Sequence, residues 1–221
     1  MKKALSASDP AVVADRIRAL ELTPVSRETS VRLEKFVELL FQWQAKTNLV
    51  AAAELPQIWT RHISDSLQLL PLVPNARTWV DFGSGGGFPA IPIACALTDR
   101  PGAQIHLVES NGKKAAFLRE ASRVTGAPAL VHQKRIEDCG ESFGDKIDVI
   151  SARALAPLTI LCAHAFPLIA RGGVGLFQKG QDVGVELTKA TKYWNIGFEL
   201  VPSVTGDGVI VVVRQLERRA G

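Results

Sequence analysis

The sequence predicts an α/β fold, in which a mostly parallel sheet ends in an antiparallel pair of strands and follows a helical N-terminal cap. After Arg77, short β-rich runs alternate with helical segments, which is the pattern of βαβ units around a parallel sheet. Only Pro202–Asp207 separates the last two runs, and so short a connection permits only an antiparallel hairpin. Together these features predict a seven-stranded sheet with an antiparallel last strand.

The cap is expected to begin with two helices. Asp9 stands before Pro10 as a capping carboxylate, and Ala11–Leu20 then has helical spacing. A second helix is predicted from Ser26, because apolar residues recur there every three or four positions. These residues are Leu33, Phe36, Val37, Leu40 and Trp43.

The cap is expected to end after a third helical stretch, from about Leu55 to Leu72. The turn at 72–75 marks a change of architecture. We therefore expect a cap over residues 1–74 and a Rossmann-like domain over 75–221, in one compact unit. The expected strands are Thr78–Phe82, Gln104–Glu109, Ala129–His132, Ile147–Ser151, Gly173–Gln178, Phe198–Val201 and Gly208–Val213.

The composition is that of a globular domain with a real core: 221 residues, 47% hydrophobic and 22% charged. A net charge of +4 favours an acidic partner, with nucleic acid the leading candidate. Cys95, Cys139 and Cys162 lack the spacing of a disulfide framework or a zinc site. Prolines interrupt the longest apolar segments, so we expect no membrane span. We also expect a cytoplasmic monomer that holds no metal.

A glycine-rich turn follows the first predicted strand. Gly83, Gly85 and Gly87 alternate between Asp81 and the helical segment Ala90–Leu97, so that backbone can approach a ligand closely. A dinucleotide fingerprint needs a third glycine at position 88, where this chain has phenylalanine. No Lys-Ser or Lys-Thr pair follows the turn, which excludes a P-loop.

An acidic residue ends the second predicted strand. Glu109 lies about as far beyond the turn as the residue that binds ribose hydroxyls in nucleoside-cofactor folds. Asp81 and Glu109 are therefore expected to bracket an adenosyl group, with the glycine backbone at Gly83 and Gly85 close to it. Five parallel strands followed by an antiparallel pair are the arrangement of class I S-adenosylmethionine-dependent methyltransferases rather than of a dehydrogenase.

Motifs that are more specific than the glycine turn cover most of the chain. They are Trp43 with Thr47–Leu49, Arg61–Leu67, Asp81–Pro89, Glu109–Lys114 with Phe117–Leu118, Arg135–Glu137, Ala152–Ala154 and Lys179–Gly180. With these motifs the sequence resembles the bacterial glucose-inhibited division protein B family, the small-subunit rRNA methyltransferases G that act on guanine N7 of 16S ribosomal RNA.

The resemblance implies a set of site residues. Gly83 and Phe88 touch S-adenosylmethionine, Ile136 and Glu137 flank its adenine, and Arg153 lies beside its methionine end and the target base. It also implies 16S rRNA within the 30S subunit as the partner.

The chain departs from the family pattern at two positions. Ala90 stands where the family more often has glycine, and Glu109 where aspartate is common.

The residues also constrain the acceptor. An exocyclic-amine methyltransferase usually carries an Asn-Pro-Pro-Tyr-like motif after the fourth strand, whereas this chain reads Ser151–Pro157. Cys139 and Cys162 lack the motif context of a cytosine C5 enzyme. Guanine N7 carries a free lone pair and no proton, so it needs no general base. Arg153 is expected to act catalytically by donating to guanine O6.

Four further residues are expected on the substrate side. Arg61, His62 and Asp65 share one side of the third helical stretch, although a surface ion pair with a packing histidine is an equally good interpretation. Lys179 can neutralise a phosphate or be a plain surface lysine. Two other functions stay open, namely methylation of another RNA, a protein or a small molecule, and nucleotide binding without methyl transfer.

Overall fold

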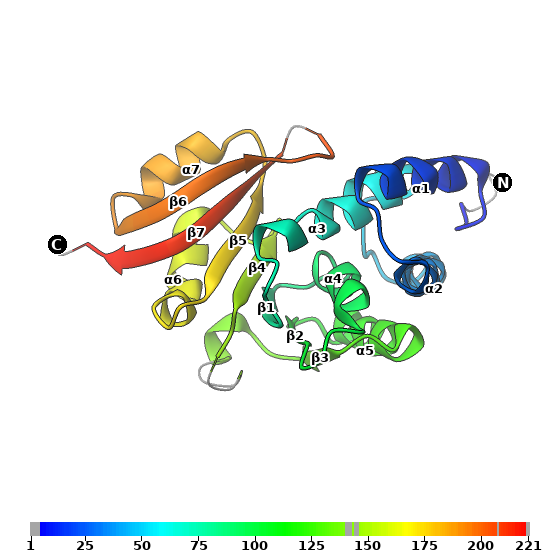
Figure 1. Ribbon diagram of the computed structural model, residues 1–221, viewed down its shortest axis with the longest axis horizontal. Coiled ribbons are helices and arrows are strands. Elements are labelled where there is room, and N and C mark those ends of the chain that lie inside the picture. The colour runs from blue at the N-terminus through cyan, green and yellow to red at the C-terminus, as the bar shows by residue number, and fades with distance from the viewer. Residues whose placement is uncertain (1–4, 140–142, 144–145, 207, 220–221) are drawn as a thin grey trace.

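The computed structural model describes residues 5–139, 143, 146–206 and 208–219. They form one seven-stranded sheet in the order β3-β2-β1-β4-β5-β7-β6 (Figure 1). The first five strands pair in parallel, and β7 is antiparallel to both of its neighbours, which confirms the predicted fold class. The strands are β1 (Thr78–Phe82), β2 (Gln104–Val108), β3 (Ala129–His132), β4 (Val149–Arg153), β5 (Val174–Lys179), β6 (Trp194–Pro202) and β7 (Val209–Arg218).

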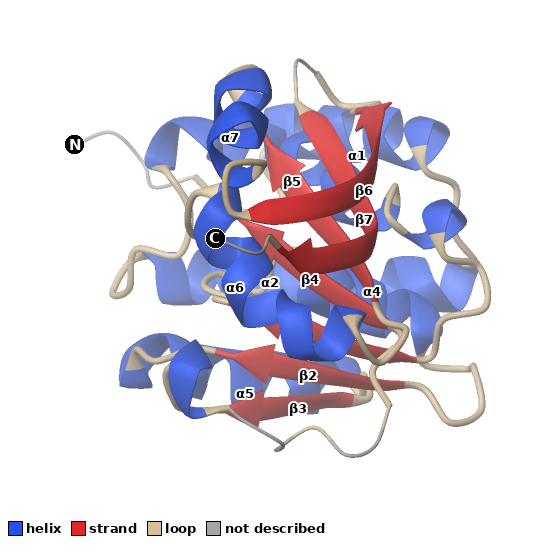
Figure 2. Cartoon of the chain, turned by 90° about the vertical axis from the view of Figure 1, so that its left-hand side faces the viewer, coloured by secondary structure: helices blue, strands red, loops and turns tan. Residues whose placement is uncertain are grey.

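Helices cover both faces of this sheet (Figure 2). One apolar core contains side chains of α2, α4 and α5, and the other contains side chains of α6 and α7. The helices are α1 (Pro10–Leu22), α2 (Arg27–Gln44), α3 (Asp65–Leu67), α4 (Ala90–Leu97), α5 (Gly112–Thr125), α6 (Leu158–Ile169) and α7 (Val183–Ala190). The two layers leave the carboxyl ends of the parallel strands as the edge at which a ligand can bind.

The N-terminal helices share a core with the sheet domain. Phe36 of α2 is fully buried, and its ring lies 5.3 Å from that of Phe88 and 6.1 Å from that of Phe117. Trp43 extends this cluster, 5.7 Å from Phe117. The apolar stripe of α2 is therefore buried against the helices that follow β1 and β2. The division of the chain at residue 74 stays a prediction.

The start of α1 differs from expectation in one detail. Asp9 precedes the helix, but its carboxylate makes no capping bond to it and instead accepts from the backbone N–H of Ser6 at 2.6 Å. Pro10 at the first helical position lacks an N–H, which removes one of the donors that a capping carboxylate would satisfy.

The third helical stretch is a series of short segments rather than one helix. Pro56 and Pro71 lack the N–H that a continuous α-helix needs, so the segments around them are short 3₁₀ helices. Asp15 of α1 is fully buried and accepts from the N–H groups of Trp59 and Thr60, which fixes the start of the middle segment. The segments are the 3₁₀ turn Ala52–Gln57, the π-helical turn Trp59–Ser64, α3 and the 3₁₀ turn Leu70–Leu72.

Several strand boundaries also differ from expectation. β4 ends at Arg153, two residues beyond the predicted end, because Arg153 still pairs in register with Gln178 of β5. The last hairpin is longer than its apolar runs, since β6 and β7 pair over their whole length with an irregularity at Gly197/Phe198. Among its outer residues Trp194 and Leu216 are buried, but most of the others are polar or exposed, so too few apolar positions alternate to mark a strand.

The described residues include no helix long and apolar enough to cross a membrane. Across the same residues, no group of three or more His, Cys, Asp or Glu side chains could hold a metal ion. Cys95, Cys139 and Cys162 are buried and free.

Candidate cofactor and acceptor site

The glycine turn joins β1 to the helical segment that carries α4. Gly83 and Gly85 have φ of +70° and +51°, which residues with a side chain rarely adopt. A Cβ at Gly83 would lie 2.5 Å from Cδ1 of Leu155, which packs against the turn from the loop after β4. A Cβ at Gly85 would meet only the carbonyl oxygen of Gly83, at 3.6 Å. The backbone at Gly85 is thus open to a ligand.

Glu109 directly follows β2 and holds the turn in place. Its Oε2 accepts from the N–H of Gly85 at 2.9 Å, and its Oε1 accepts from the N–H of Asn111 at 2.7 Å. Only 8% of the residue is exposed. Each carboxylate oxygen has a further lone pair, so Glu109 can still accept a hydroxyl donor.

Asp81 lies at the end of β1 and is buried. Its Oδ1 accepts from the hydroxyl of Ser151 at 2.7 Å, whereas Oδ2 has no hydrogen-bond partner within the described part of the chain. Burial raises the pKa of Asp81 to about 7, because charge is disfavoured away from water. Asp81 Oδ2 is therefore a buried oxygen beside the turn that is available to accept a hydrogen bond. Together with the open backbone of Gly85 and the spare lone pairs of Glu109, it fits a cofactor rich in hydroxyl and ammonium donors.

Ile136 and Glu137 lie on a 3₁₀ turn (Ile136–Asp138) just beyond the end of β3. Ile136 is partly buried against the core under α6. The Glu137 side chain is 63% exposed, with its carboxylate 3.6 Å from His164 Nε2. β3 and β2 are neighbouring parallel strands, so this turn lies at the same sheet edge as Glu109.

Arg153, the last residue of β4, is held by two cap side chains. Its Nη2 donates to His62 Nδ1 at 2.7 Å. Its Nη1 lies 3.4 Å from Asp65 Oδ2 and has no hydrogen-bond partner among the described residues. The guanidinium carbon is 6.0 Å from the centre of the Phe88 ring. Burial lowers the pKa of Arg153, and nearby carboxylates including Asp65 oppose that shift. Arginine nevertheless stays charged, because its ordinary pKa is far above neutrality.

His62 comes from the π-helical turn and is only 3% exposed. Its ring lies 4.8 Å from that of Phe88, and its Nε2 is 3.0 Å from Glu54 Oε2. Burial, reinforced by the positive charges of Arg153 and Arg61, lowers the pKa of His62 to about 3. The ring is therefore neutral near pH 7.

Asp65 connects the cap to the sheet and to the last hairpin. Oδ2 accepts from Gln178 Nε2 at 2.7 Å. Oδ1 accepts from Gln68 Nε2 at 2.7 Å, from Thr205 Oγ1 at 3.1 Å and from Ser203 Oγ at 3.3 Å. In Figure 1 the segment with α3 accordingly passes beside the tip of the β6–β7 hairpin.

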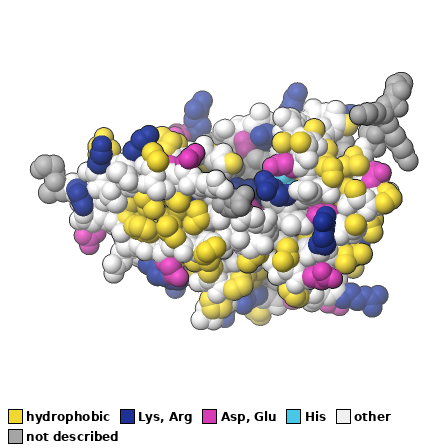
Figure 3. Space-filling view, turned by 90° about the horizontal axis from the view of Figure 1, so that it is seen from above, with side chains coloured by type: hydrophobic (Ala, Val, Ile, Leu, Met, Phe, Trp, Pro, Cys, Tyr) yellow, Lys and Arg dark blue, Asp and Glu magenta, His cyan; other side chains and the backbone are white. Residues whose placement is uncertain are grey.

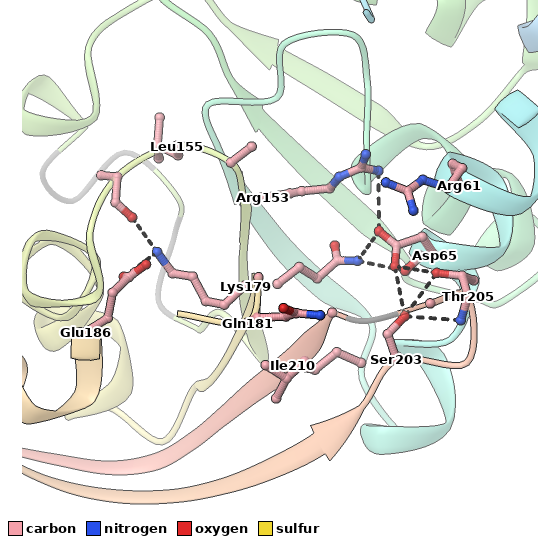
Figure 4. A pocket seen from close by; sticks show the side chains of 17 residues that line it. Arg61, Asp65, Arg153, Leu155, Lys179, Gln181, Glu186, Ser203, Thr205 and Ile210 are labelled. Atoms are coloured by element: carbon pink, nitrogen blue, oxygen red, sulfur yellow. Dashed lines mark hydrogen bonds and ion pairs between the residues drawn. The ribbon is translucent and has the colours of Figure 1, made fainter. Parts of the chain in front are cut away.

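A cavity of about 650 Å³ lies among the ends of β4 and β5, α3 and the hairpin (Figure 4). Arg61, Asp65 and Arg153 lie on one side of it. Lys179 lies on the other, where its Nζ donates to Ala156 O at 2.6 Å and pairs with Glu186 at 2.7 Å. The structure thus brings the predicted Arg61, His62, Asp65 and Arg153 together and places Lys179 across the cavity.

Basic side chains are not gathered into one patch on the face seen from above. They are interspersed with acidic ones, and a histidine lies beside basic side chains near the centre (Figure 3).

Comparison with known proteins decides the family. The model of the rRNA small subunit methyltransferase G family matches residues 29–206. A protein of that name from Bradyrhizobium sp. strain BTAi1 is 59% identical over 208 residues, which cover 94% of this chain and 94% of the relative. The chain belongs to the small-subunit rRNA methyltransferase G family. A family relative from Nitrobacter hamburgensis is 56% identical over 220 residues, or 99% of this chain and 85% of the relative.

Solved structures share the fold of this family member. Cofactor-bound Rv0187 from MTB has a TM-score of 0.59 at 16% identity and covers 94% of this chain, with 98% of its own length matched. A mutant of MtNAS in complex with S-adenosylmethionine has a TM-score of 0.56 at 15% identity, with 94% of this chain and 80% of its own length covered. The predicted family, the predicted fold class and the assignment as an rRNA methyltransferase are confirmed.

The sequence pattern does not reveal the residues that hold the predicted site side chains in place. Glu54 precedes His62 by eight residues within an irregular stretch, so no helical period joins them. Leu155, Gln178 and Glu186 carry no motif of their own. Their roles are visible only where β4, β5 and α7 meet around the cavity.

Proposed function

We propose that the protein transfers a methyl group from S-adenosylmethionine to N7 of a guanine in 16S rRNA of the small ribosomal subunit. One observation carries the proposal: Arg153 lines the cavity, and its guanidinium lies 6.0 Å from the ring of Phe88 in the glycine turn. A base in that cavity lies next to a cofactor on the turn. The names of the relatives, which specify small-subunit ribosomal RNA, support this acceptor.

The cofactor half consists of residues at the ends of β1 to β4. Asp81 and Glu109 bind donors of the cofactor, and the backbone at Gly83 and Gly85 approaches it closely. Phe88, Ile136, Glu137 and Arg153 complete the pocket. Bound S-adenosylmethionine supplies a sulfonium methyl, whose bond to sulfur breaks as the acceptor lone pair forms the new bond.

The acceptor half requires orientation rather than proton removal. Guanine N7 has a lone pair and no proton, so the site needs no general base. Arg153 donates from Nη1, which has no hydrogen-bond partner within the described residues, to guanine O6. One hydrogen bond to O6 leaves N7 free for attack. Alignment of the methyl donor with the acceptor nitrogen lowers the barrier.

The cap forms the outer wall of the acceptor side. Arg61, half exposed on the cavity rim, attracts RNA phosphates. His62 and Asp65 hold Arg153. Lys179 has a carboxylate partner and contributes positive charge across the cavity. We further propose that residues 1–74 act as this cap and that a cytoplasmic monomer works on the 30S subunit.

Methylation with labelled S-adenosylmethionine tests the assignment. We expect label in 30S subunits or their naked 16S rRNA, and mass spectrometry should place it on guanine N7. Arg153→Ala should lose turnover far more than stability, with most of the protein still folded at the assay temperature. Absence of label from both substrates, or label on another atom, contradicts the proposal. Unchanged turnover of Arg153→Ala contradicts the role of that residue.

A further inference from the structure

Glu54, His62 and Arg153 form a continuous chain of polar contacts between the cap and β4. Glu54 Oε2 is 3.0 Å from His62 Nε2, and His62 Nδ1 is 2.7 Å from Arg153 Nη2. Glu54 lies in the 3₁₀ turn Ala52–Gln57, far from any glycine-turn or strand-end motif. Glu54 does not line the cavity and reaches it through the side chains of His62 and Arg153.

The donors and acceptors along this chain can be assigned from chemistry. An arginine guanidinium has only N–H donors, so the contact with Arg153 forms only in the tautomer in which His62 Nδ1 carries no proton. A neutral imidazole carries one proton, which must then be on Nε2. That N–H points at the Glu54 carboxylate, which can only accept when ionised.

The other groups that face the His62 ring favour the same state. Arg153 and Arg61 lower the pKa of the ring together with burial, which excludes a doubly protonated imidazolium near pH 7. Phe88 packs on the ring and offers it no polar atom. The neutral ring has one proton for its two nitrogens. Its tautomer therefore decides whether Nδ1 accepts from Arg153 or carries a proton that faces the guanidinium.

We propose that Glu54 is a positioning residue that fixes the His62 tautomer with the proton on Nε2, and thereby holds Arg153 at the edge of the acceptor cavity. Glu54 Oε1 is also 3.8 Å from Arg61 Nη2, but this ion pair is half exposed on the cavity rim and contributes little. The proposal rests on the proposed function of this site.

Imidazole nitrogen NMR tests the tautomer without any assay of methyl transfer. The chain has four histidines, and a His62→Phe variant assigns the relevant signals by their loss. The wild type should show a proton on Nε2 and a bare Nδ1. Glu54→Ala should give mixed tautomers, whereas Glu54→Gln should keep the wild-type pattern because its amide oxygen still accepts. A wild type with its proton on Nδ1, or an unchanged Glu54→Ala spectrum, overturns the proposal.

Methylation kinetics test the consequence for Arg153. Loss of one part-buried hydrogen bond has a modest effect, so Glu54→Ala should lower kcat/KM about two- to tenfold. Glu54→Gln should stay within about twofold. Glu34→Gln serves as the matched control, because Glu34 is a cap carboxylate paired with Arg16 outside the site. Melting temperatures identify any variant that loses activity by unfolding.

A double-mutant cycle separates action through His62 from a general charge effect. In the His62→Phe background, Glu54→Ala should cause no further loss of kcat/KM. Additive losses, or an equal loss in Glu54→Gln and Glu54→Ala, overturn the proposal. If the acceptor were another molecule, the methylation assay on 30S subunits would fail for every variant, while the NMR result would stand unchanged.

Discussion

The carboxylate of Asp65 and the amide of Gln178 join the helical cap to the fifth strand, with Gln178 Nε2 donating to Asp65 Oδ2 at 2.7 Å. The same carboxylate binds two hydroxyls of the β6–β7 hairpin and lies beside Arg153. One side chain of the cap thus positions three walls of the acceptor cavity.

Asp65→Asn should destabilise the protein, because the amide removes the charge beside Arg153 and turns one acceptor into a donor. Hydrogen bonds to a charged group contribute about 1.5–3 kcal/mol. We expect the melting temperature to fall by about 3–12 °C, measured by scanning calorimetry. Asp99→Asn is the control, since that carboxylate is 70% exposed in its pair with Arg32 and should change melting by no more than about 1 °C. Equal shifts in both variants would contradict the role of Asp65.

Gly83→Ala should weaken cofactor binding more than stability. The new Cβ meets Leu155 at 2.5 Å and imposes a left-handed conformation on alanine. Calorimetric titration with S-adenosylmethionine should show a loss of about tenfold or more. Gly126 has a similar φ of +65°, but a Cβ there would meet no described atom within 4 Å. Gly126→Ala should therefore lose only about 1 kcal/mol of stability from backbone strain and keep its affinity for S-adenosylmethionine.

A second substitution separates the two causes at Gly83. Leu155→Ala removes the contacting methyl groups but not the backbone strain. The double variant Gly83→Ala/Leu155→Ala should therefore bind better than expected from the two single losses. Strict additivity would mean that the contact with Leu155 plays no part.

Glu186 should stabilise the fold by holding the end of the loop that follows β4. Its Oε2 accepts from the N–H of Leu158, the first residue of α6, at 2.6 Å and pairs with Lys179. Glu186→Gln keeps an acceptor for Leu158 but loses the charge, whereas Glu186→Ala loses both. Melting temperatures should therefore fall in the order wild type, Gln, Ala, with a total loss of about 1–3 kcal/mol. Glu199→Gln, an exposed carboxylate on β6, should melt like the wild type.

Asp81 should make the stability of the cofactor-free protein depend on pH. Its folded pKa of about 7 lies above its ordinary value of 3.8, so its contribution is fully present below about pH 4 and is lost as the pH rises through 7. Asp81→Asn cannot titrate. Its free energy of unfolding relative to the wild type should therefore rise between pH 5 and pH 8, as urea titrations at both values can measure. A constant difference would mean that Asp81 is ionised at both.

The parts of the site that were predictable lie close together in sequence or at one edge of the sheet. The glycine turn and Glu109 each stand at the end of a strand, and parallel strands bring those ends together. The predicted Arg61, His62, Asp65 and Arg153 do converge. Helical spacing places the first three on one side of their segment, whereas the position of Arg153 beside the target base is implied by the family resemblance.

By itself the sequence determined the order of strands and helices, the glycine turn and its acidic neighbour, and the family. These depend on periodicity, on glycine conformation and on short motifs, all of which are local. Only the tertiary structure decided that His62 meets Arg153 across 91 residues, that Asp65 reaches Ser203 across 138, and that Leu155 covers Gly83. Such contacts depend on how the cap packs on the sheet through Phe36 and Phe88, and no local pattern encodes that packing.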